Sequence, residues 1–423
     1  MTLAIINGHF INPADNTSEK RDVLIADGRI IETGTGLTGD ETIDAAGCVV
    51  APGLVDIHCH FREPGFESKE TIASGSRAAA KGGFTTVVTM ANTNPPIDNA
   101  GLLELIIKRA REEACIRVRP AACATKGLRS EEITEMADLK DAGAVAITDD
   151  GHDIASSRLM RHALEYAGMV DMPFLSHCED EALSEGGVMN EGYMAALMGL
   201  PGTPKAAEEV RIDRNIRLAE LAGAHIHIQH VSTAAGVEII RQAKRRGARV
   251  TGESAPHYFC LTDEAVRGFN TNAKMNPPLR EPEDVAAVIE AFKDGTLDCI
   301  ATDHAPHTLT EKRVEFALAP FGIIGLETSL ALTLTHLVQP GHISLEHAVR
   351  LLTLGGARVC NIAEAGTIAP GAPADIVVFN PDAEWTVAAD SFASKSGNSP
   401  FIGYTLKGKV THTLCGGKVV YCE

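Results

Sequence analysis

Between residues 54 and 302 the chain alternates short apolar runs with longer stretches of helical periodicity. Helical spacing is clear in Leu102–Ala114, Glu131–Ala142, Glu208–Ala222, Ala234–Arg246 and Glu283–Phe292. The apolar runs predict eight strands: one ending in His58-Cys59-His60, then Phe84–Thr89, Val118–Cys123, Ala144–Thr148, Phe174–His177, His225–His230, Arg249–Glu253 and Cys299–Thr302. Eight strands that alternate with helices over roughly 250 residues predict an α/β fold, a (β/α)8 TIM-like barrel. An open doubly wound sheet would need a G-x-G-x-x-G loop after its first strand, and that loop is missing.

The two ends of the chain have a different pattern, in which short strands follow one another without helices between them. Asn7-Gly8 and Asp27-Gly28 predict the type I′ turns of two hairpins. Further strands are predicted near the C-terminus, for example Asp375–Phe379 and Val410–Leu414. Because edge strands need partners, we expect both ends to build one composite β-sandwich. The predicted domains are residues 1–52 and 365–423 for the β-sandwich and residues 53–364 for the barrel.

Candidate metal ligands follow the predicted strands, at the ends where barrels place their chemistry. They are His58 and His60, the pair Asp149-Asp150, His177, His230 and Asp303. Residues i and i+2 of a strand point to the same side, so His58 and His60 reach one point. Each histidine alone could be a packing or surface residue, but their coincidence at strand ends predicts a two-metal hydrolytic site. Spacing leaves open whether Asp149 or Asp150 bridges the metals.

Charge and cysteine usage exclude several classes of function. The formal net charge of −18 argues against nucleic acid or an anionic membrane as a partner, because both would be repelled. No apolar run is long enough to span a bilayer, and no signal-peptide-like start is present. The ten cysteines include no C-x-x-C pair. We therefore expect a cytoplasmic protein without disulfides.

Five segments carry a distinctive pattern: Val55–Gly65 (VDIHCHFREPG), Met90–Pro95 (MANTNP), Lys274–Arg280 (KMNPPLR), Ala301–His307 (ATDHAPH) and Phe321–Glu327 (FGIIGLE). Together they resemble the amidohydrolase superfamily, and more narrowly the class I dihydroorotases whose bridging ligand is an aspartate. The resemblance covers essentially the whole chain. It implies the reversible cyclisation of N-carbamoyl-L-aspartate to L-dihydroorotate, a step of de novo pyrimidine biosynthesis.

The resemblance also implies two Zn²⁺ ions per subunit. It assigns their ligands position by position: His58 and His60 on the first ion, Asp150 as the bridge, and His177 and His230 on the second. Metal-bound hydroxide would open the ring, because a metal ion lowers the pKa of its water. Asp303, close to the first metal, would be the catalytic acid/base that takes and returns the proton.

The expected substrate contacts are His60, Arg62, Asn92, Asn276, His307, Phe321 and Gly322. Arg62 can pair bidentately with the substrate carboxylate that does not react, with Asn92 and His307 beside it. Asn276 and the backbone of Phe321-Gly322 are candidates for the ring amides. Asn92 and Asn276 lie close to prolines, so each can also be a simple turn residue. The segment 308–320 has little periodicity and is expected to be a mobile loop that covers the substrate.

Two alternatives to this interpretation remain. Related hydantoinases and allantoinases use a carboxylated lysine as the bridge at the fourth strand, but here that strand ends in Thr148-Asp149-Asp150-Gly151. The missing lysine argues against another cyclic amidase. The second alternative is a partner-dependent, weakly active scaffold of aspartate transcarbamoylase, although such a scaffold should lack a metal ligand and this chain lacks none. The resemblance also implies a homodimer and a possible association with aspartate transcarbamoylase.

Overall fold

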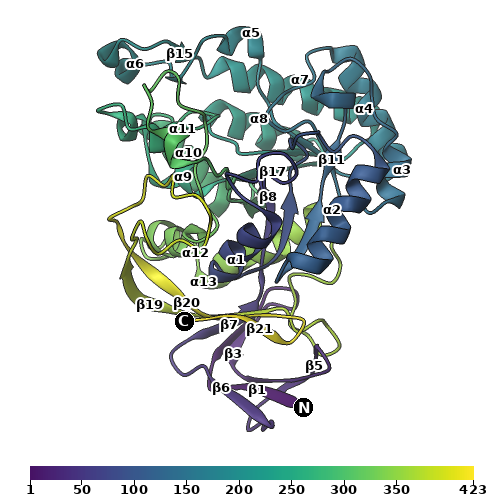
Figure 1. Cartoon of the computed structure of the whole chain (residues 1–423), viewed down its shortest axis with the longest axis vertical. Coiled ribbons are helices and arrows are strands. Elements are labelled where there is room, and N and C mark those ends of the chain that lie inside the picture. Colours follow the sequence, from purple (N-terminus) through teal and green to yellow (C-terminus); the bar gives the residue numbers. More distant parts are fainter.

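Strands from both ends of the chain pair in one sheet. The structure, a computed structural model, describes residues 1–423. One antiparallel contact joins β19 (Ile376–Thr386) to β7 (Val49–Pro52), so the two ends share a six-stranded sheet. The other strands of this sheet are β2 (His9–Asn12), β3 (Thr17–Lys20), β20 (Thr405–Cys415) and β21 (Lys418–Cys422). Figure 1 shows these purple and yellow strands together below the helical part of the molecule.

A second sheet packs against the first. It consists of β1 (Thr2–Ile6), β4 (Asp22–Ala26), β5 (Arg29–Gly34) and β6 (Glu41–Asp44). Buried side chains of both sheets form one apolar cluster, which includes Ile5 and Val23 from the second sheet and Phe10, Val50 and Ile376 from the first. The terminal segments therefore have a core of their own.

The predicted hairpin at Asn7-Gly8 is wrong, whereas the one at Asp27-Gly28 is confirmed. Strand β1 pairs with β4 and β6, but β2 pairs with β3 and β7 in the other sheet, so Asn7-Gly8 crosses from sheet to sheet. A Cβ atom on Gly8 would lie 2.4 Å from the Val50 side chain, so only glycine fits this crossing. At the second turn, Asp27 and Gly28 both have positive φ angles and β4 pairs antiparallel with β5.

Parallel strands in chain order make up the central part of the molecule. Each predicted apolar run contains a strand: β8 (Leu54–Cys59), β9 (Phe84–Thr89), β10 with β11 (Arg117–Pro120 and Ala122–Cys123), β12 (Ile147–Thr148), β13 (Phe174–Ser176), β16 (Ile226–Ile228), β17 (Val250–Ser254) and β18 (Cys299–Ile300). All neighbouring pairs that the sheets contain are parallel. The predicted α/β class is confirmed.

Helices pack outside these strands and bury one face each. They include α1 (Ile72–Lys81), α2 (Ala100–Glu113), α3 (Met136–Asp141), α4 (Ser157–Met169), α7 (Ala206–Ala222), α8 (Ala234–Arg245) and α10 (Pro282–Lys293). In α8, for example, Val237, Ile240 and Ala243 are buried at helical spacing, and the Thr233 side chain caps the first turn. No helix of the chain has both the length and the apolar composition needed to cross a membrane.

The remaining elements are short and lie mostly in the connections. They are α5 (Glu181–Ser184), β14 (Met189–Asn190), α6 (Tyr193–Met198), β15 (Gly202–Thr203), α9 (Pro256–Cys260), α11 (Leu309–Lys312), α12 (Ser329–Thr333), α13 (Leu345–Arg350) and α14 (Gly356–Val359), with the 3-10 helices η1 (Lys126–Leu128), η2 (Asp263–Val266) and η3 (Thr271–Ala273) and the π-helices η4 (Leu334–Val338) and η5 (Leu351–Gly355). The single residue Gly53 separates β7 from β8. A Cβ atom there would lie 2.1 Å from the Thr85 hydroxyl oxygen, so the passage between the two parts of the molecule requires glycine.

Candidate metal centre

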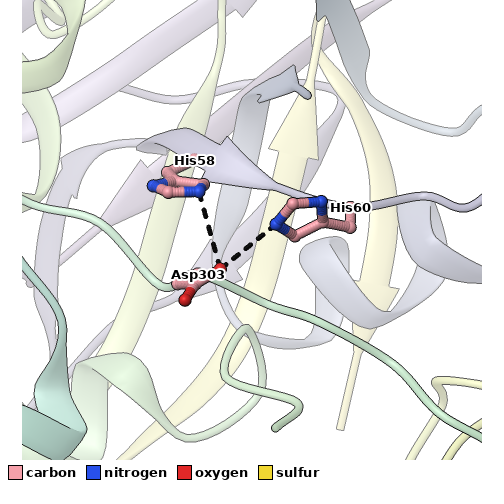
Figure 2. A group of neighbouring side chains, drawn as sticks. All are labelled: His58, His60 and Asp303. Atoms are coloured by element: carbon pink, nitrogen blue, oxygen red, sulfur yellow. Dashed lines mark hydrogen bonds and ion pairs between the residues drawn. The ribbon is translucent and has the colours of Figure 1, made fainter. Parts of the chain in front are cut away.

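The carboxyl end of β8 carries two histidines on one side. His58 and His60 both face Asp303, which follows β18 (Figure 2). The Cys59 thiol instead contacts the carbonyl oxygen of Val88. The carboxylate of Asp56 accepts hydrogen bonds from the backbone N–H and the hydroxyl of Thr302. This contact fixes the end of β8 against the segment that carries Asp303.

Asp303 lies between the two imidazoles. One carboxylate oxygen, Oδ1, is 3.2 Å from Nε2 of His60 and 3.5 Å from Nε2 of His58. Asp150, at the end of β12, approaches the same rings from another strand, with Oδ1 3.2 Å from Nε2 of His58 and Oδ2 3.5 Å from Nε2 of His60. Both carboxylates are therefore directed to one point.

His177 and His230 complete the group. Nδ1 of His177 is 3.8 Å and Nε2 of His230 is 3.9 Å from Oδ1 of Asp150. The same two ring nitrogens lie 2.8 Å from each other. The structure thus brings together all six residues that the sequence analysis selected as metal ligands, from the ends of β8, β12, β13, β16 and β18.

Geometry distinguishes the two adjacent aspartates. Asp149 accepts hydrogen bonds from the backbone N–H groups of Ala124 and Thr125, at 2.8 and 2.9 Å, and from the Thr125 hydroxyl. Its side chain therefore faces the neighbouring loop. The side chain of Asp150 faces the imidazoles, as expected of the residue chosen for the bridge.

Three residues of the site have backbone conformations that are unfavourable for any residue but glycine. The φ angles are +58° at Arg62, +35° at His230 and +46° at Asp303. Each such residue costs on the order of 1–3 kcal/mol and persists only where surrounding contacts impose it. Strained backbone of this kind is common at functional sites. Here the unusual φ angles turn side chains at neighbouring strand ends towards one another.

The electrostatics of the site favour a bound cation. Burial alone would lower the pKa of His58, but the carboxylates of Asp150, Asp303 and Glu253 raise it well above its ordinary value. Burial and the neighbouring His177 and His58 rings lower the pKa of His230 to about 3, so this ring is neutral. Imidazole binds a metal in its neutral form, and a carboxylate pair that attracts a proton to His58 equally attracts a divalent cation.

The ligand atoms meet the requirements of a metal site. Those of His58, His60 and Asp303 lie within 4.8 Å of one another, and so do those of His58, Asp150 and His230. The buried Nε2 atom of His58 lies 3.2 and 3.5 Å from the carboxylates of Asp150 and Asp303 but forms a hydrogen bond of good geometry with neither, an arrangement that a bound cation would satisfy. Imidazole nitrogens and carboxylate oxygens are suitable ligands for first-row divalent metals. These residues can hold a metal ion.

Two glutamates that the sequence analysis missed orient the histidines. Glu253, at the end of β17, lies 2.7 Å from Nδ1 of His58 and directs its Nε2 to the centre of the site. Glu179 lies 3.1 Å from Nε2 of His177 and accepts a hydrogen bond of 2.7 Å from Asn276. Glu253 ends a predicted strand, which was a usable signal, whereas nothing in the spacing indicated Glu179.

The expected substrate residues border the metal ligands. Asn92 accepts a hydrogen bond of 2.9 Å from Nδ1 of His60 and donates to the carbonyl oxygen of Asp150 at 3.3 Å. One guanidinium nitrogen of Arg62 lies 3.5 Å from Nε2 of His307, and the Arg62 Nε–H donates to the carbonyl oxygen of Pro306. Arg62 therefore lies between the metal ligands and the segment after β18.

The backbone at Phe321 and Gly322 closes this side of the site. Nε2 of His307 lies 2.8 Å from the carbonyl oxygen of Phe321, and Phe321 as a whole residue is 38% exposed. The Gly322 N–H donates to the carbonyl oxygen of Lys274, and the Gly322 carbonyl accepts from Asn398. The Gly322 N–H is thus already used within the protein, and its carbonyl oxygen retains one lone pair.

Comparison with known proteins gives consistent relatives over the full chain. A family model described as dihydro-orotase-like matches residues 47–235, and a model of the amidohydrolase family matches residues 282–421. Dihydroorotase of Pelobacter propionicus is 51% identical over 424 residues, which is 100% of both chains. Dihydroorotase of Pelotomaculum thermopropionicum is 51% identical over 422 residues, covering 99% of this chain and 98% of its own length.

Solved structures of similar fold include proteins named hydantoinase and dihydropyrimidinase. L-hydantoinase (dihydropyrimidinase) from Arthrobacter aurescens has a TM-score of 0.90 and 27% identity, with 99% of this chain and 96% of that chain covered. Dihydropyrimidinase from Brevibacillus agri has a TM-score of 0.87 and 26% identity, with 100% and 95% covered. Identity of about one half across the entire length, far above that to the hydantoinases, shows that the chain belongs to the dihydroorotase family of the amidohydrolase superfamily.

Proposed function

We propose that the chain catalyses the reversible cyclisation of N-carbamoyl-L-aspartate to L-dihydroorotate, and that the six histidine and aspartate residues at the strand ends perform it. The observation that carries this proposal is their convergence: the carboxylates of Asp150 and Asp303 approach the same Nε2 atom of His58 at 3.2 and 3.5 Å. The names of the full-length relatives supply the substrate.

For the metal centre we propose two Zn²⁺ ions. His58 and His60, with Asp303 close by, would hold the first, and His177 and His230 would hold the second, with Asp150 between them. When bound, the metal ions lower the pKa of a water molecule and polarise the amide carbonyl. The mixed imidazole and carboxylate ligand set supports this choice of metal.

In this mechanism Asp303 is the residue that accepts a proton from the attacking water and later returns it. Burial would raise the pKa of Asp303, but the His58 and His60 rings hold it below its usual range, so the group is ionised and can accept a proton. Its Oδ1 atom lies 3.2 Å from Nε2 of His60, within the proposed metal centre. In hydrolysis Asp303 passes this proton to the departing ring nitrogen, and in cyclisation the transfer runs in reverse.

Binding of the substrate carboxylate is the role we assign to Arg62. The planar guanidinium offers two parallel donors, and its position beside His307 puts it at the border of the metal ligands. Asn92 would assist, with His60 beside it. Asn276 and the backbone of Phe321-Gly322 would contact the ring amides, and the bond from Asn276 to Glu179 supports its place near His177.

For the architecture we infer that the parallel strands form one closed (β/α)8 barrel of residues 53–364. The break between β10 and β11 is bridged by Ala121, whose N–H donates to Thr89 on one side of the strand, while Ala122 donates to Ala146 on the other. The His60 N–H donates to the carbonyl oxygen of His304 at 2.8 Å, which supports closure between the first and last strands. Residues 1–52 and 365–423 would form the β-sandwich.

We also propose a homodimer, with a possible association with aspartate transcarbamoylase, on the strength of the family alone. Light scattering of the purified chain distinguishes a mass of about twice 44.8 kDa from that of a monomer.

Turnover of L-dihydroorotate by the purified chain tests the proposed function. A metal chelator should abolish the activity, and added Zn²⁺ should restore it. Absence of turnover with both ions loaded, or turnover that survives complete removal of metal, would contradict the proposal.

A further inference from the structure

Two buried lysines hold the segment that follows His307. Lys312, the last residue of α11, is only 3% exposed, and Lys274 is 2% exposed. Fully buried lysines are rare unless they are paired with a carboxylate. Here the nearest carboxylate along the chain, that of Glu311, instead binds Lys69 at 2.9 Å and caps α11 through Thr308. The ammonium group of Lys312 therefore needs other partners.

Those partners are three backbone carbonyl oxygens. Nζ of Lys312 donates to the carbonyl oxygen of Thr271 at 2.9 Å, of Lys274 at 3.3 Å and of Pro320 at 2.7 Å. An ammonium group has three N–H donors, so all of them are used. Two of the carbonyls belong to the segment 271–274 and the third to the end of the segment 308–320. Lys312 thus ties these two segments together.

These hydrogen bonds of Lys312 lie next to the backbone that borders the proposed substrate site. Pro320 directly precedes Phe321 and Gly322, and the Lys274 carbonyl oxygen that accepts from Lys312 also accepts from the Gly322 N–H at 2.9 Å. Removing Lys312 would release the Pro320 carbonyl and one of the two hydrogen bonds to the Lys274 carbonyl, while Gly322 keeps its own hydrogen bonds to Lys274 and Asn398. The backbone that leads into Phe321, whose carbonyl oxygen contacts His307, would then be held less firmly.

Lys274 supports the same backbone from the other side. Its Nζ donates to the carbonyl oxygens of Phe316 and Ala317, at 2.8 and 3.0 Å, and lies 4.6 Å from the centre of the Phe321 ring. Lys274 therefore binds carbonyl groups of the segment 308–320, and Lys312 binds carbonyl groups of both segments. The two together hold 308–320 against 271–274 without any carboxylate.

We propose that Lys312 is a positioning residue for substrate binding, which holds the Phe321-Gly322 backbone in place through the carbonyl oxygens of Pro320 and Lys274. This inference rests on the proposed function, because it takes Phe321-Gly322 as the border of the substrate site. The hydrogen bonds of Lys312 go to backbone carbonyls and to none of the six proposed metal ligands. Its loss should weaken substrate binding and leave the chemical step and the metals intact.

The test compares Lys312→Met with Lys293→Met, a matched change at an exposed lysine of α10 that pairs only with Glu290. In metal-loaded enzyme we expect Lys312→Met to raise the KM for L-dihydroorotate by about tenfold, with kcat within about threefold of the unmodified enzyme. Metal content should be unchanged. Lys312→Arg keeps the charge and several donors, so it should recover part of the lost affinity.

An unchanged KM in folded, metal-loaded Lys312→Met, or a fall in kcat with unchanged KM, would overturn the role of Lys312. If Lys312→Met does not fold, Lys312→Gln, which is shorter and uncharged but keeps two N–H donors, takes its place and must still raise KM, by less than the rise expected for Met. Turnover of L-dihydroorotate by the unmodified enzyme and by Lys293→Met shows that the proposed function itself holds. Failure of both to turn over the substrate would overturn the proposed function, and the role of Lys312 with it.

Discussion

In the proposed mechanism Asp303 would join the metal centre to the proton transfer, because one oxygen of its carboxylate contacts both histidines of β8. Replacing Asp303 by Asn keeps the size and one oxygen but removes the ability to carry a proton. We expect the metals to stay while turnover falls by roughly 10² to 10⁴, the usual contribution of a positioned acid/base. Asp382→Asn, at an exposed position of β19, is the matched control. Near-normal rates in the Asp303 variant would assign the proton transfer to another residue.

The same assignment predicts opposite pH dependences for the two directions in the unmodified enzyme. The neighbouring imidazoles lower the pKa of Asp303, so the ionised form that hydrolysis needs is lost only as pH falls into the acid range. Cyclisation needs the protonated form and gains from the same change. Rates in both directions across pH check this sign, and parallel profiles would contradict it.

The adjacent aspartates provide a matched pair for the bridge. Asp150→Ala removes the carboxylate that faces His58 and His60 and should lose one or both metal ions. Asp149→Ala removes a carboxylate that binds the backbone at Ala124 and Thr125, so its metal content should stay near normal. Elemental analysis of both variants decides between them. Full metal content in the Asp150 variant, with loss in the Asp149 variant, would reverse the assignment.

Residue roles that follow from a regular spacing in a strand could be predicted from the sequence. Roles that depend on contacts with a distant loop could not. His58 and His60 are two apart in a strand, so their common side followed from the alternation of side chains. Asp149 and Asp150 are equivalent in spacing, and only the backbone N–H groups of another loop separate them. Glu179 reaches His177 from a connection without periodicity, so its role could not be predicted.

Among the elements, the start of α7 is tied to the strand end that carries His230. Glu208 accepts a hydrogen bond of 2.8 Å from the Ser232 N–H and forms a buried ion pair with Arg280 at 3.2 Å. Both side chains of this pair are at most 5% exposed. Arg280 also donates to Asn190 of β14. This buried network therefore connects three elements around the metal centre.

Glu208→Ala should leave Arg280 as an unpaired buried charge and lower the free energy of unfolding by about 3–5 kcal/mol. Glu112→Ala, on the exposed face of α2, should change it by about 0.5 kcal/mol or less. Urea unfolding of the metal-loaded variants measures both. A loss below about 1 kcal/mol for Glu208→Ala would mean that the network contributes little to stability.

Strands and helices were predicted best where one local sequence pattern was enough to specify them. The run Phe84–Thr89 is β9 without any shift, because it is apolar, β-branched and buried along its whole length. The hairpin at Asn7-Gly8 failed because a turn sequence specifies a change of direction but not the partner of each strand. Ile5 of β1 and Phe10 of β2 are both buried in the cluster between the two sheets. Each residue enters this cluster from its own sheet, so β1 and β2 do not pair with each other.

On the scale of the whole molecule, the two chain ends meet in one sheet as predicted from their unpaired edges. The register of β19 against β7, from Ile376 opposite Pro52 to Phe379 opposite Val49, could not be read from the sequence. It depends on which residues enter the core between the sheets. The anchoring of 308–320 was equally hidden, because the acceptors of Lys312 are backbone carbonyls, which every sequence provides.

As a metal-dependent dihydroorotase, this chain should differ in substrate preference from other cyclic amidases of the same fold. The most direct test is kcat/KM for L-dihydroorotate, hydantoin and allantoin on one purified sample, with the metal content measured on the same sample. We predict two zinc ions per chain and a preference for L-dihydroorotate of at least about a hundredfold, because Arg62 would bind a carboxylate that the other two substrates lack. Equal or faster turnover of hydantoin would contradict this account.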